Sequence, residues 1–220
     1  MRPKMIVLIP TLIAVTLVTS LEMAFAQTEI LTFDDLPGVG GFDQYLLVPN
    51  GYGGLQWQNF QYMDGLAQPN SGYLNGVVSP NNIAFNDAGN PALISDGSFN
   101  LNSAYLTAAW NDGLQVEVQG FVGAALIYDH TYTVNTTGPT LVNFNYTGID
   151  QVTFISSGGT LHPGISGRGE QFVMDNLSIT PVAEPSTVAL VGLATMSLIL
   201  RCLTPRCSQR PLPLEISFER

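Results

Sequence analysis

Apolar and polar residues alternate along much of the middle of this chain, and this alternation limits the folds open to it. The clearest case is Leu-Gln-Val-Glu-Val-Gln at 114–119. A period of two puts one kind of side chain on each face of an extended strand, with one face buried. The same pattern predicts strands at 30–33, 55–60, 103–110, 124–134, 140–146, 151–155 and 171–180. No stretch of 27–181 keeps a helical period.

Clusters of asparagine, glycine and proline separate the predicted strands, as expected for turns. Asn-Asp-Gly at 111–113 is the strongest hairpin signal, because its residues tolerate a positive φ angle and it joins two predicted strands. Many short strands joined by turns favour sheets packed face to face. We therefore predict an all-β fold, an antiparallel β-sandwich (jelly roll).

The start of the chain has the features of a secretory signal peptide. Arg2 and Lys4 give it a positive charge, 6–21 is largely apolar, and Ala-Phe-Ala at 24–26 has the small-x-small pattern of a cleavage site. We expect a signal helix, 1–26, that is removed after Ala26. An uncleaved membrane anchor is the alternative.

A second apolar segment, 188–200, lies near the C-terminus between a short polar motif and an arginine. The flanking residues are Glu184, Pro185, Ser186, Thr187 and, after the apolar run, Arg201. Helices that cross a bilayer need about 20 apolar residues, so this one would be a short transmembrane helix. The arginine side would stay in the cytoplasm, with the preceding chain outside. A helix docked on the domain is the alternative.

This order of Glu-Pro-Ser-Thr, short apolar helix and basic residues resembles the PEP-CTERM sorting signal of bacterial exopolysaccharide-associated proteins. The resemblance implies processing by a membrane enzyme, an exosortase. Ala183 replaces the proline that usually opens the motif, and the chain continues past the basic cluster to Arg220. The implied organisation is a signal peptide (1–26), a β-sandwich domain (27–181), the sorting signal with its transmembrane helix (182–210) and a basic, proline-containing tail (211–220).

The predicted domain is strongly acidic. It contains thirteen aspartates and glutamates but one basic residue, Arg168, a formal charge of −12. This charge repels phosphate backbones, so nucleic acid is excluded as a partner, while carboxylate oxygens suit cations such as calcium. Both cysteines, Cys202 and Cys207, lie beyond the apolar run. The domain therefore has no disulfide framework and depends on its hydrophobic core.

Short motifs of the domain support a second resemblance. They are Phe33-Asp34-Asp35-Leu36, Gly51-Tyr52-Gly53-Gly54-Leu55 with Trp57 and Phe60, Asn75-Gly76-Val77-Val78-Ser79, Leu101-Asn102-Ser103-Ala104-Tyr105, Gly148-Ile149-Asp150 and Met174-Asp175-Asn176. Together they resemble the jelly-roll domains, similar to carbohydrate-binding modules, that accompany this sorting signal. The resemblance implies a sandwich and glycan binding.

Asp175 is a candidate metal ligand. If Val173, Leu177 and Ile179 face the core, strict alternation turns Asp175 inward with them. A buried carboxylate must be protonated, paired or bound to a metal, because an isolated buried charge is costly.

Two neighbours are open to Asp175. Arg168 is the one arginine or lysine of the domain, and Asp34 and Asp35 end the first predicted strand. Carboxylates brought together would repel unless calcium lay between them. The alternatives are a calcium site at Asp34, Asp35 and Asp175, a salt-bridged or hydrogen-bonded Asp175, and an exposed Asp175.

Aromatic residues are the other candidates for binding, because sugar rings stack on flat aromatic faces. Tyr52 and Tyr73 lie in glycine-rich segments, so we expect them to be exposed and to bind glycan. Trp57 and Trp110 have apolar neighbours and are expected to pack in the core.

No arrangement in the sequence indicates catalysis, and neither His130 nor His162 has zinc-site spacing. We predict a non-enzymatic, exported protein of the cell envelope or extracellular exopolysaccharide, transiently anchored in the membrane. A secreted glycan-cleaving hydrolase and a structural matrix protein without a ligand are the alternatives. Two carboxylates converging in one open groove would favour the hydrolase.

Overall fold

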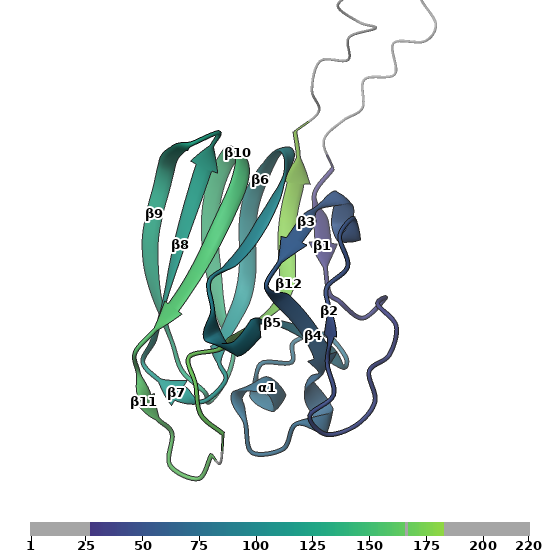
Figure 1. Cartoon of the computed structure of the whole chain (residues 1–220), viewed down its shortest axis with the longest axis vertical. Helices are drawn as coiled ribbons and strands as arrows, with labels where there is room; N and C mark the ends of the chain where they lie inside the picture. The colour runs from purple at the N-terminus through teal and green to yellow at the C-terminus, as the bar shows by residue number, and fades with distance from the viewer. Residues whose placement is uncertain (1–26, 166, 183–220) are drawn as a thin grey trace, which may run out of the picture. The chain divides into compact units, whose positions relative to one another are not determined.

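The computed structural model describes residues 27–165 and 167–182 (Figure 1). The predicted signal peptide, the tail and all of the sorting signal except Val182 lie outside the described residues. Their helices therefore stay predictions, including the motif from Glu184 to Thr187 and the arginine Arg201. In the described part of the chain, no helix is long and apolar enough to cross a membrane.

Strands make up almost all of the regular secondary structure of the described chain. The strands are β1 (Glu29–Leu31), β2 (Leu46–Leu47), β3 (Gln56–Gln58), β4 (Phe60–Asp64), β5 (Asn82–Asn86), β6 (Ala92–Ala108), β7 (Asn111–Asp112), β8 (Leu114–Val122), β9 (Ala125–Val134), β10 (Thr140–Ser157), β11 (Thr160–Leu161) and β12 (Phe172–Pro181). One short helix, α1 (Gly72–Asn75), and three 3-10 turns, Tyr52–Gly54, Gly65–Ala67 and Asp87–Gly89, accompany them. The prediction of an all-β, antiparallel body is confirmed; the finer jelly-roll assignment stays a prediction.

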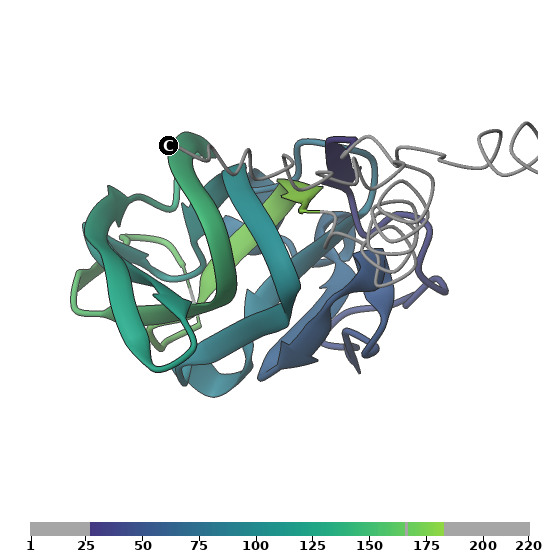
Figure 2. The ribbon, with the colours of Figure 1, turned by 90° about the horizontal axis from the view of Figure 1, so that it is seen from above.

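Within the described residues, ten strands join into one antiparallel sheet. Its order is β2-β4-β5-β12-β6-β10-β8-β9, with β1 added to β12 and β3 to β6. The two long strands, β6 and β10, pair with each other over both halves, and their register shifts between 143 and 151. Seen from above, both strands curve across the body (Figure 2).

The curvature of β6 and β10 divides this sheet into two layers. The start of β6 lies between β3 and the end of β10, whereas its later part lies between β12 and the start of β10. β8 and β9 extend the first layer, and β5, β4 and β2 extend the second. The body is therefore a sandwich whose two layers share their longest strands.

The core fills the space between the layers. Phe154 of β10 packs against Phe60 of β4 and Phe172 of β12, with ring centroids 5.8 and 5.7 Å apart. All three rings are buried. The predicted inward residues of β8, at 114, 116 and 118, are also fully buried, which confirms the alternation there. Each such side chain contributes about 1.5–3 kcal/mol, so the core can stabilise the domain without disulfides.

The hairpin predicted at 111–113 is wrong. The strands on either side of it, β6 and β8, are separated in the sheet by β10. Asn111 and Asp112 instead form β7, which pairs with β11 in a separate two-stranded sheet. Gly113 has the expected positive φ of 73°. The turn at Gly113 is thus confirmed, but β6 and β8 pair with other strands and not with each other.

The Asp112 side chain ties this small sheet to two loops. One carboxylate oxygen lies 2.6 Å from His162 Nδ1, and the other accepts hydrogen bonds from the Thr136 hydroxyl and backbone N–H at 2.7 and 2.9 Å. These hydrogen bonds lower the pKa of Asp112 to about 2, and those from Thr136 have the largest effect. The backbone N–H of His162 donates to the backbone carbonyl of Trp110, so the network also holds the chain at Trp110.

Replacing Asp112 with asparagine should flatten the acid dependence of stability. The folded-state pKa is about 2, below an unfolded value of about 3.9, so ionised Asp112 stabilises the fold above the unfolded value. This contribution is lost as the pH falls through the folded value. Melting temperatures from about pH 6 to about pH 2 should therefore drop more steeply for the unmutated protein than for Asp112→Asn. Parallel curves would contradict this role of Asp112.

Candidate functional site

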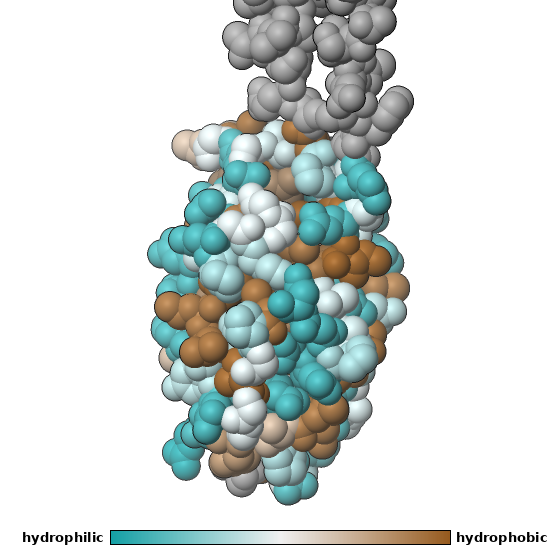
Figure 3. Space-filling view, turned by 90° about the vertical axis from the view of Figure 1, so that its right-hand side faces the viewer, coloured by the Kyte–Doolittle hydropathy of each residue, from teal (hydrophilic) through white to brown (hydrophobic). Residues whose placement is uncertain are grey.

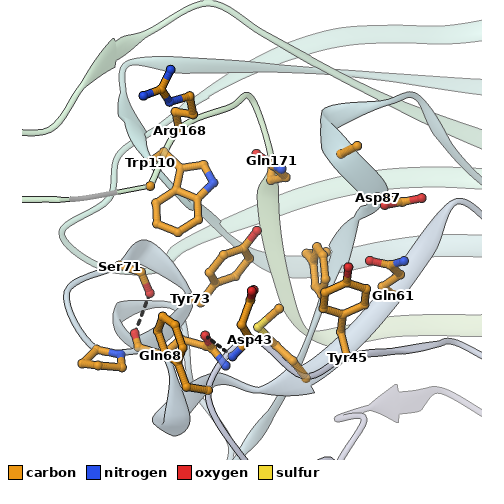
Figure 4. Close-up of a pocket in the computed structure, with 16 residues that line it drawn as sticks. Asp43, Tyr45, Gln61, Gln68, Ser71, Tyr73, Asp87, Trp110, Arg168 and Gln171 are labelled. Atoms are coloured by element: carbon orange, nitrogen blue, oxygen red, sulfur yellow. Dashed lines mark hydrogen bonds between the residues drawn. The ribbon is translucent and has the colours of Figure 1, made fainter.

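A groove of about 520 Å³ lies beside α1 (Figure 4). Segments far apart in the sequence form its walls: 42–45, β4, 68–73, 85–88, Trp110 and 167–171. Ligand sites commonly have this volume and this mixture of aromatic and polar lining. The groove is therefore the candidate functional site.

Four aromatic rings form a row along the groove. Tyr45 packs edge-on against Phe85, Phe85 against Tyr73, and Tyr73 against Trp110, with centroids 6.0, 5.2 and 5.2 Å apart. Phe85 and Tyr73 are buried, whereas Tyr45 is 49% exposed. The inner rings are thus fixed by packing, and Tyr45 presents an accessible ring to a ligand. A fifth ring, Phe42, lines the same groove and is 70% exposed.

The expected exposure of Tyr73 is wrong, because this side chain is only 5% exposed. Its segment is a short helix capped by Ser71, whose hydroxyl donates to the Gln68 carbonyl at 2.6 Å and accepts from Leu74 N–H at 3.4 Å. Gly72 lets this helix lie against the end of β6, since a Cβ there would come within 1.7 Å of the Ala108 carbonyl oxygen. Here the glycine indicates a close approach of backbones and not an exposed loop.

Polar groups surround the aromatic row. Asp43, Asp87 and Arg168 lie on separate parts of the lining (Figure 4). Burial, and then the charge of Asp43, raise the pKa of the Tyr73 phenol, which therefore remains protonated and can donate a hydrogen bond. The groove thus offers acceptors and donors around an apolar floor.

Two further polar atoms of the groove residues have no partner. Within the described residues, Trp110 Nε1 and Gln171 Oε1 are buried without a hydrogen bond. Figure 4 shows the indole nitrogen of Trp110 on the side of the ring facing Gln171. Unpaired buried polar atoms cost about 1–3 kcal/mol each, so a small movement that let a ligand hydroxyl reach them would be favourable. Trp110, which we expected in the core, is half-buried in this wall.

The surface near the groove also carries apolar side chains. Phe42, Leu46 and Leu47 are each at least half exposed. On the face that presents β1 to β4, apolar residues form separate patches among polar ones (Figure 3). Phe42 and Tyr45 are not among the site residues predicted from the sequence, although the two glycines immediately before Phe42 are a signal for an exposed aromatic segment.

Asp175 is buried, as predicted, but it does not face the main core. Asn176 has a φ of 51° and the register with β6 shifts after Asp175, so a bulge interrupts the alternation. Leu177 and Ile179 therefore belong to the main core, whereas Val173 packs in a second cluster. Strict alternation was the wrong assumption because one left-handed residue reverses which face the later side chains occupy.

The carboxylate of Asp175 accepts four hydrogen bonds. The donors are the N–H groups of Val78 and Ser79 at 2.7 and 3.0 Å, the Ser79 hydroxyl at 3.1 Å and the Asn176 N–H at 2.7 Å. Burial raises the pKa of Asp175, and the hydrogen bonds oppose this rise. Within the described residues no salt bridge joins Asp175 to Arg168, so Asp175 is a hydrogen-bonded aspartate.

Asp34 and Asp35 also accept hydrogen bonds. Asp34 accepts from the Asn82 N–H at 2.9 Å, and Asp35 accepts from the Tyr52 hydroxyl at 2.8 Å. No three His, Cys, Asp or Glu side chains of 27–165 and 167–182 gather as a metal-binding group. The structure therefore does not bring Asp34, Asp35 and Asp175 together as a three-carboxylate cluster, and calcium at any two of them stays a prediction.

Tyr52 lies apart from the groove. Its hydroxyl accepts from the Phe33 N–H at 2.9 Å, and its carbonyl accepts from the Trp57 indole N–H at 2.9 Å. Burial and the bond to Asp35 raise the pKa of the Tyr52 phenol. Trp57 is buried in the core, as expected. Of the two tyrosines predicted to bind glycan, the structure thus places Tyr73 in the groove and Tyr52 elsewhere.

No protein-family model and no curated protein sequence matches the chain. A DUF4465 family protein from Bacteroides caccae has a similar structure (TM-score 0.44, 14% identity, covering 74% of this chain and 96% of that one), as does one from Bacteroides ovatus (0.43, 10%, 71% and 100%). A third is TmCBM61 in complex with β-1,4-galactotriose (0.32, 6%, 68% and 97%). Likenesses at these scores assign no function to this chain.

Asp175→Asn tests both roles considered for this carboxylate. The amide replaces one acceptor oxygen with a donor that faces other donors, so the variant should lose about 1–3 kcal/mol of stability. Hydrogen bonding alone predicts the same loss in chelator and in millimolar calcium. The calcium prediction requires in addition that calcium raise the melting temperature of the unmutated protein and not that of the variant. Equal stability of the two proteins would contradict both roles.

Proposed function

We propose that this protein is a non-enzymatic, exported glycan-binding protein whose ligand occupies the groove beside α1. The observation that carries the proposal is the edge-to-face row of Tyr45, Phe85, Tyr73 and Trp110 beneath a polar rim. The C–H faces of sugars pack on aromatic rings, while their hydroxyl groups need hydrogen-bond donors and acceptors close by. The groove supplies both kinds of contact.

The charges of the lining favour a sugar over other polar ligands. Two carboxylates, Asp43 and Asp87, and one guanidinium, Arg168, stand among uncharged amides and hydroxyls. Nucleotides and other phosphorylated ligands carry several negative charges, which the acidic domain repels. An uncharged polyol gains hydrogen bonds from the same groups without that cost.

The hydrolase alternative has one observation in its favour, because two carboxylates line one groove. Acid–base cleavage needs an acid and a base on either side of one bond, whereas Asp43 and Asp87 lie on separate parts of the lining and Asp43 is exposed to solvent (Figure 4). Binding without cleavage is therefore the function that we favour. Incubation with a bound polysaccharide should release no reducing ends above the level produced by an Asp43→Asn, Asp87→Asn double variant.

The position of the groove fits attachment of the chain to a membrane. β1 pairs with the end of β12, so the described chain begins and ends at one end of the body (Figure 1). The groove is formed at the start of β12, where Gln171 and Trp110 lie. Ten strand residues span about 33 Å, so the groove lies about that far from the end of β12, after which the proposed tether begins. This arrangement supports a role in retaining exopolysaccharide at the cell envelope.

Tyr45→Ala should weaken binding without unfolding the domain, because Tyr45 is half exposed and contributes an accessible ring. An aromatic contact is worth about 0.5–1.5 kcal/mol, which corresponds to a roughly 2- to 12-fold loss of affinity. Affinity electrophoresis in gels containing purified exopolysaccharide measures this loss. Ile127→Ala is the matched control, since Ile127 is 52% exposed on β9, outside the groove. An equal effect of the two substitutions would contradict binding in the groove.

Replacing Glu184 and Pro185 with alanine should leave the precursor uncleaved in the membrane, because the proposed exosortase recognises this motif. Mass spectrometry of the unmutated protein from cells with an active exosortase should find Gln27 at its N-terminus and no residues from 201–220. Pro213→Ala, in the tail, serves as the control and should be processed normally. Mature protein that retains 201–220 would contradict the sorting proposal.

A further inference from the structure

Arg168 occupies an unusual position for the one arginine or lysine of this acidic domain. Its side chain lines the groove and is exposed (Figure 4). Among the described residues it makes no ion pair and no side-chain hydrogen bond, although thirteen carboxylates belong to the same domain. Even Glu170, two residues away, directs its carboxylate to the Gly158 N–H at 2.7 Å. The guanidinium therefore retains its donors for a ligand.

The loop that carries Arg168 is held against the aromatic row. A Cβ at Gly167 would come within 2.0 Å of the Trp110 ring, so glycine is needed for this contact. On the other side of Arg168, Gly169 has a φ of 130°, which side-chain-bearing residues rarely adopt. The backbone N–H of His162 also donates to the backbone carbonyl of Trp110. The close contact of Gly167 with Trp110 brings the neighbouring Arg168 beside the floor of the groove.

We infer that the groove prefers glycans carrying isolated anionic groups, a uronic acid carboxylate or a sulfate ester, and that Arg168 binds that group. This inference rests on the proposed glycan-binding function. A guanidinium donates two parallel hydrogen bonds to such an anion, and these charge-assisted bonds are stronger than neutral ones. Neutral sugars on either side of the anionic one would stack on the exposed part of the row.

The preference is for isolated charges because the other charged groups of the groove are acidic. Asp43 and Asp87 line the groove apart from Arg168 (Figure 4). Charges within about 8 Å interact at physiological salt, so these carboxylates repel anionic sugars placed near them. A polymer with a charge on every sugar therefore gains one favourable contact at Arg168 and meets repulsion at both aspartates.

The test measures binding of the mature protein to defined polysaccharides and to their neutralised forms. Glucuronoxylan carries isolated uronic acids, κ-carrageenan carries sulfate esters, and polygalacturonate carries a charge on every sugar. We expect a sparsely charged polymer to bind most tightly, polygalacturonate to bind poorly, and carboxyl reduction or desulfation of the best binder to cost roughly tenfold in affinity. Which treatment weakens binding identifies the anionic group.

Arg168→Gln should abolish the difference in affinity between the charged polymer and its neutralised form, because glutamine retains hydrogen-bonding groups but removes the positive charge. Asp87→Asn is the matched variant and should raise the affinity for polygalacturonate. Melting temperatures of both variants check that the domain remains folded. Equal binding of charged and neutral polymers, unaffected by Arg168→Gln, would overturn the inference and leave glycan binding intact. Failure to bind any polysaccharide, including purified exopolysaccharide, would overturn the proposed function as well.

Discussion

The rest of the structure depends on the pairing of β6 with β10 along both halves of their length. Because their register shifts where they curve, the same two strands belong to both layers of the sandwich. The rings of Phe60, Phe154 and Phe172 then meet between the layers and are removed from water. Apolar burial of this kind is the main stabilising contribution available to a domain without disulfides.

The groove is a consequence of where the long strands end. β6 ends at Ala108 opposite Phe172, so Trp110 and Gln171 emerge together at one end of the body. Gly72 allows α1 to lie against the same end and brings Tyr73 beside Trp110. The network of Asp112, His162 and Thr136 then holds the neighbouring loops. Rigid strands thus position a binding surface that is itself made of loops.

The proposed glycan-binding function is concentrated at that end. The aromatic row supplies apolar contact, its rim supplies hydrogen bonds, and Arg168 supplies a single positive charge within an acidic domain. The ends of the described chain lie at the opposite end, next to paired β1 and β12. The negative charge of the domain disfavours binding of densely charged polyanions.

Local chemistry determined what the sequence reveals by itself: period-two alternation predicted most of the longer strands, though not β5 or the first half of β6, and the turn signal at 111–113 predicted the positive φ of Gly113. Tertiary structure decided the rest. Pairing of β8 with β9 and β10 replaced the expected hairpin, because strand partners depend on contacts distant in sequence. The bulge at Asn176 turned Asp175 away from the main core. The groove could not be predicted, because the separate segments that line it, between 42 and 171, meet only when both layers have formed. Hydrophobic burial is non-directional, so the sequence pattern does not show which of these segments will lie together.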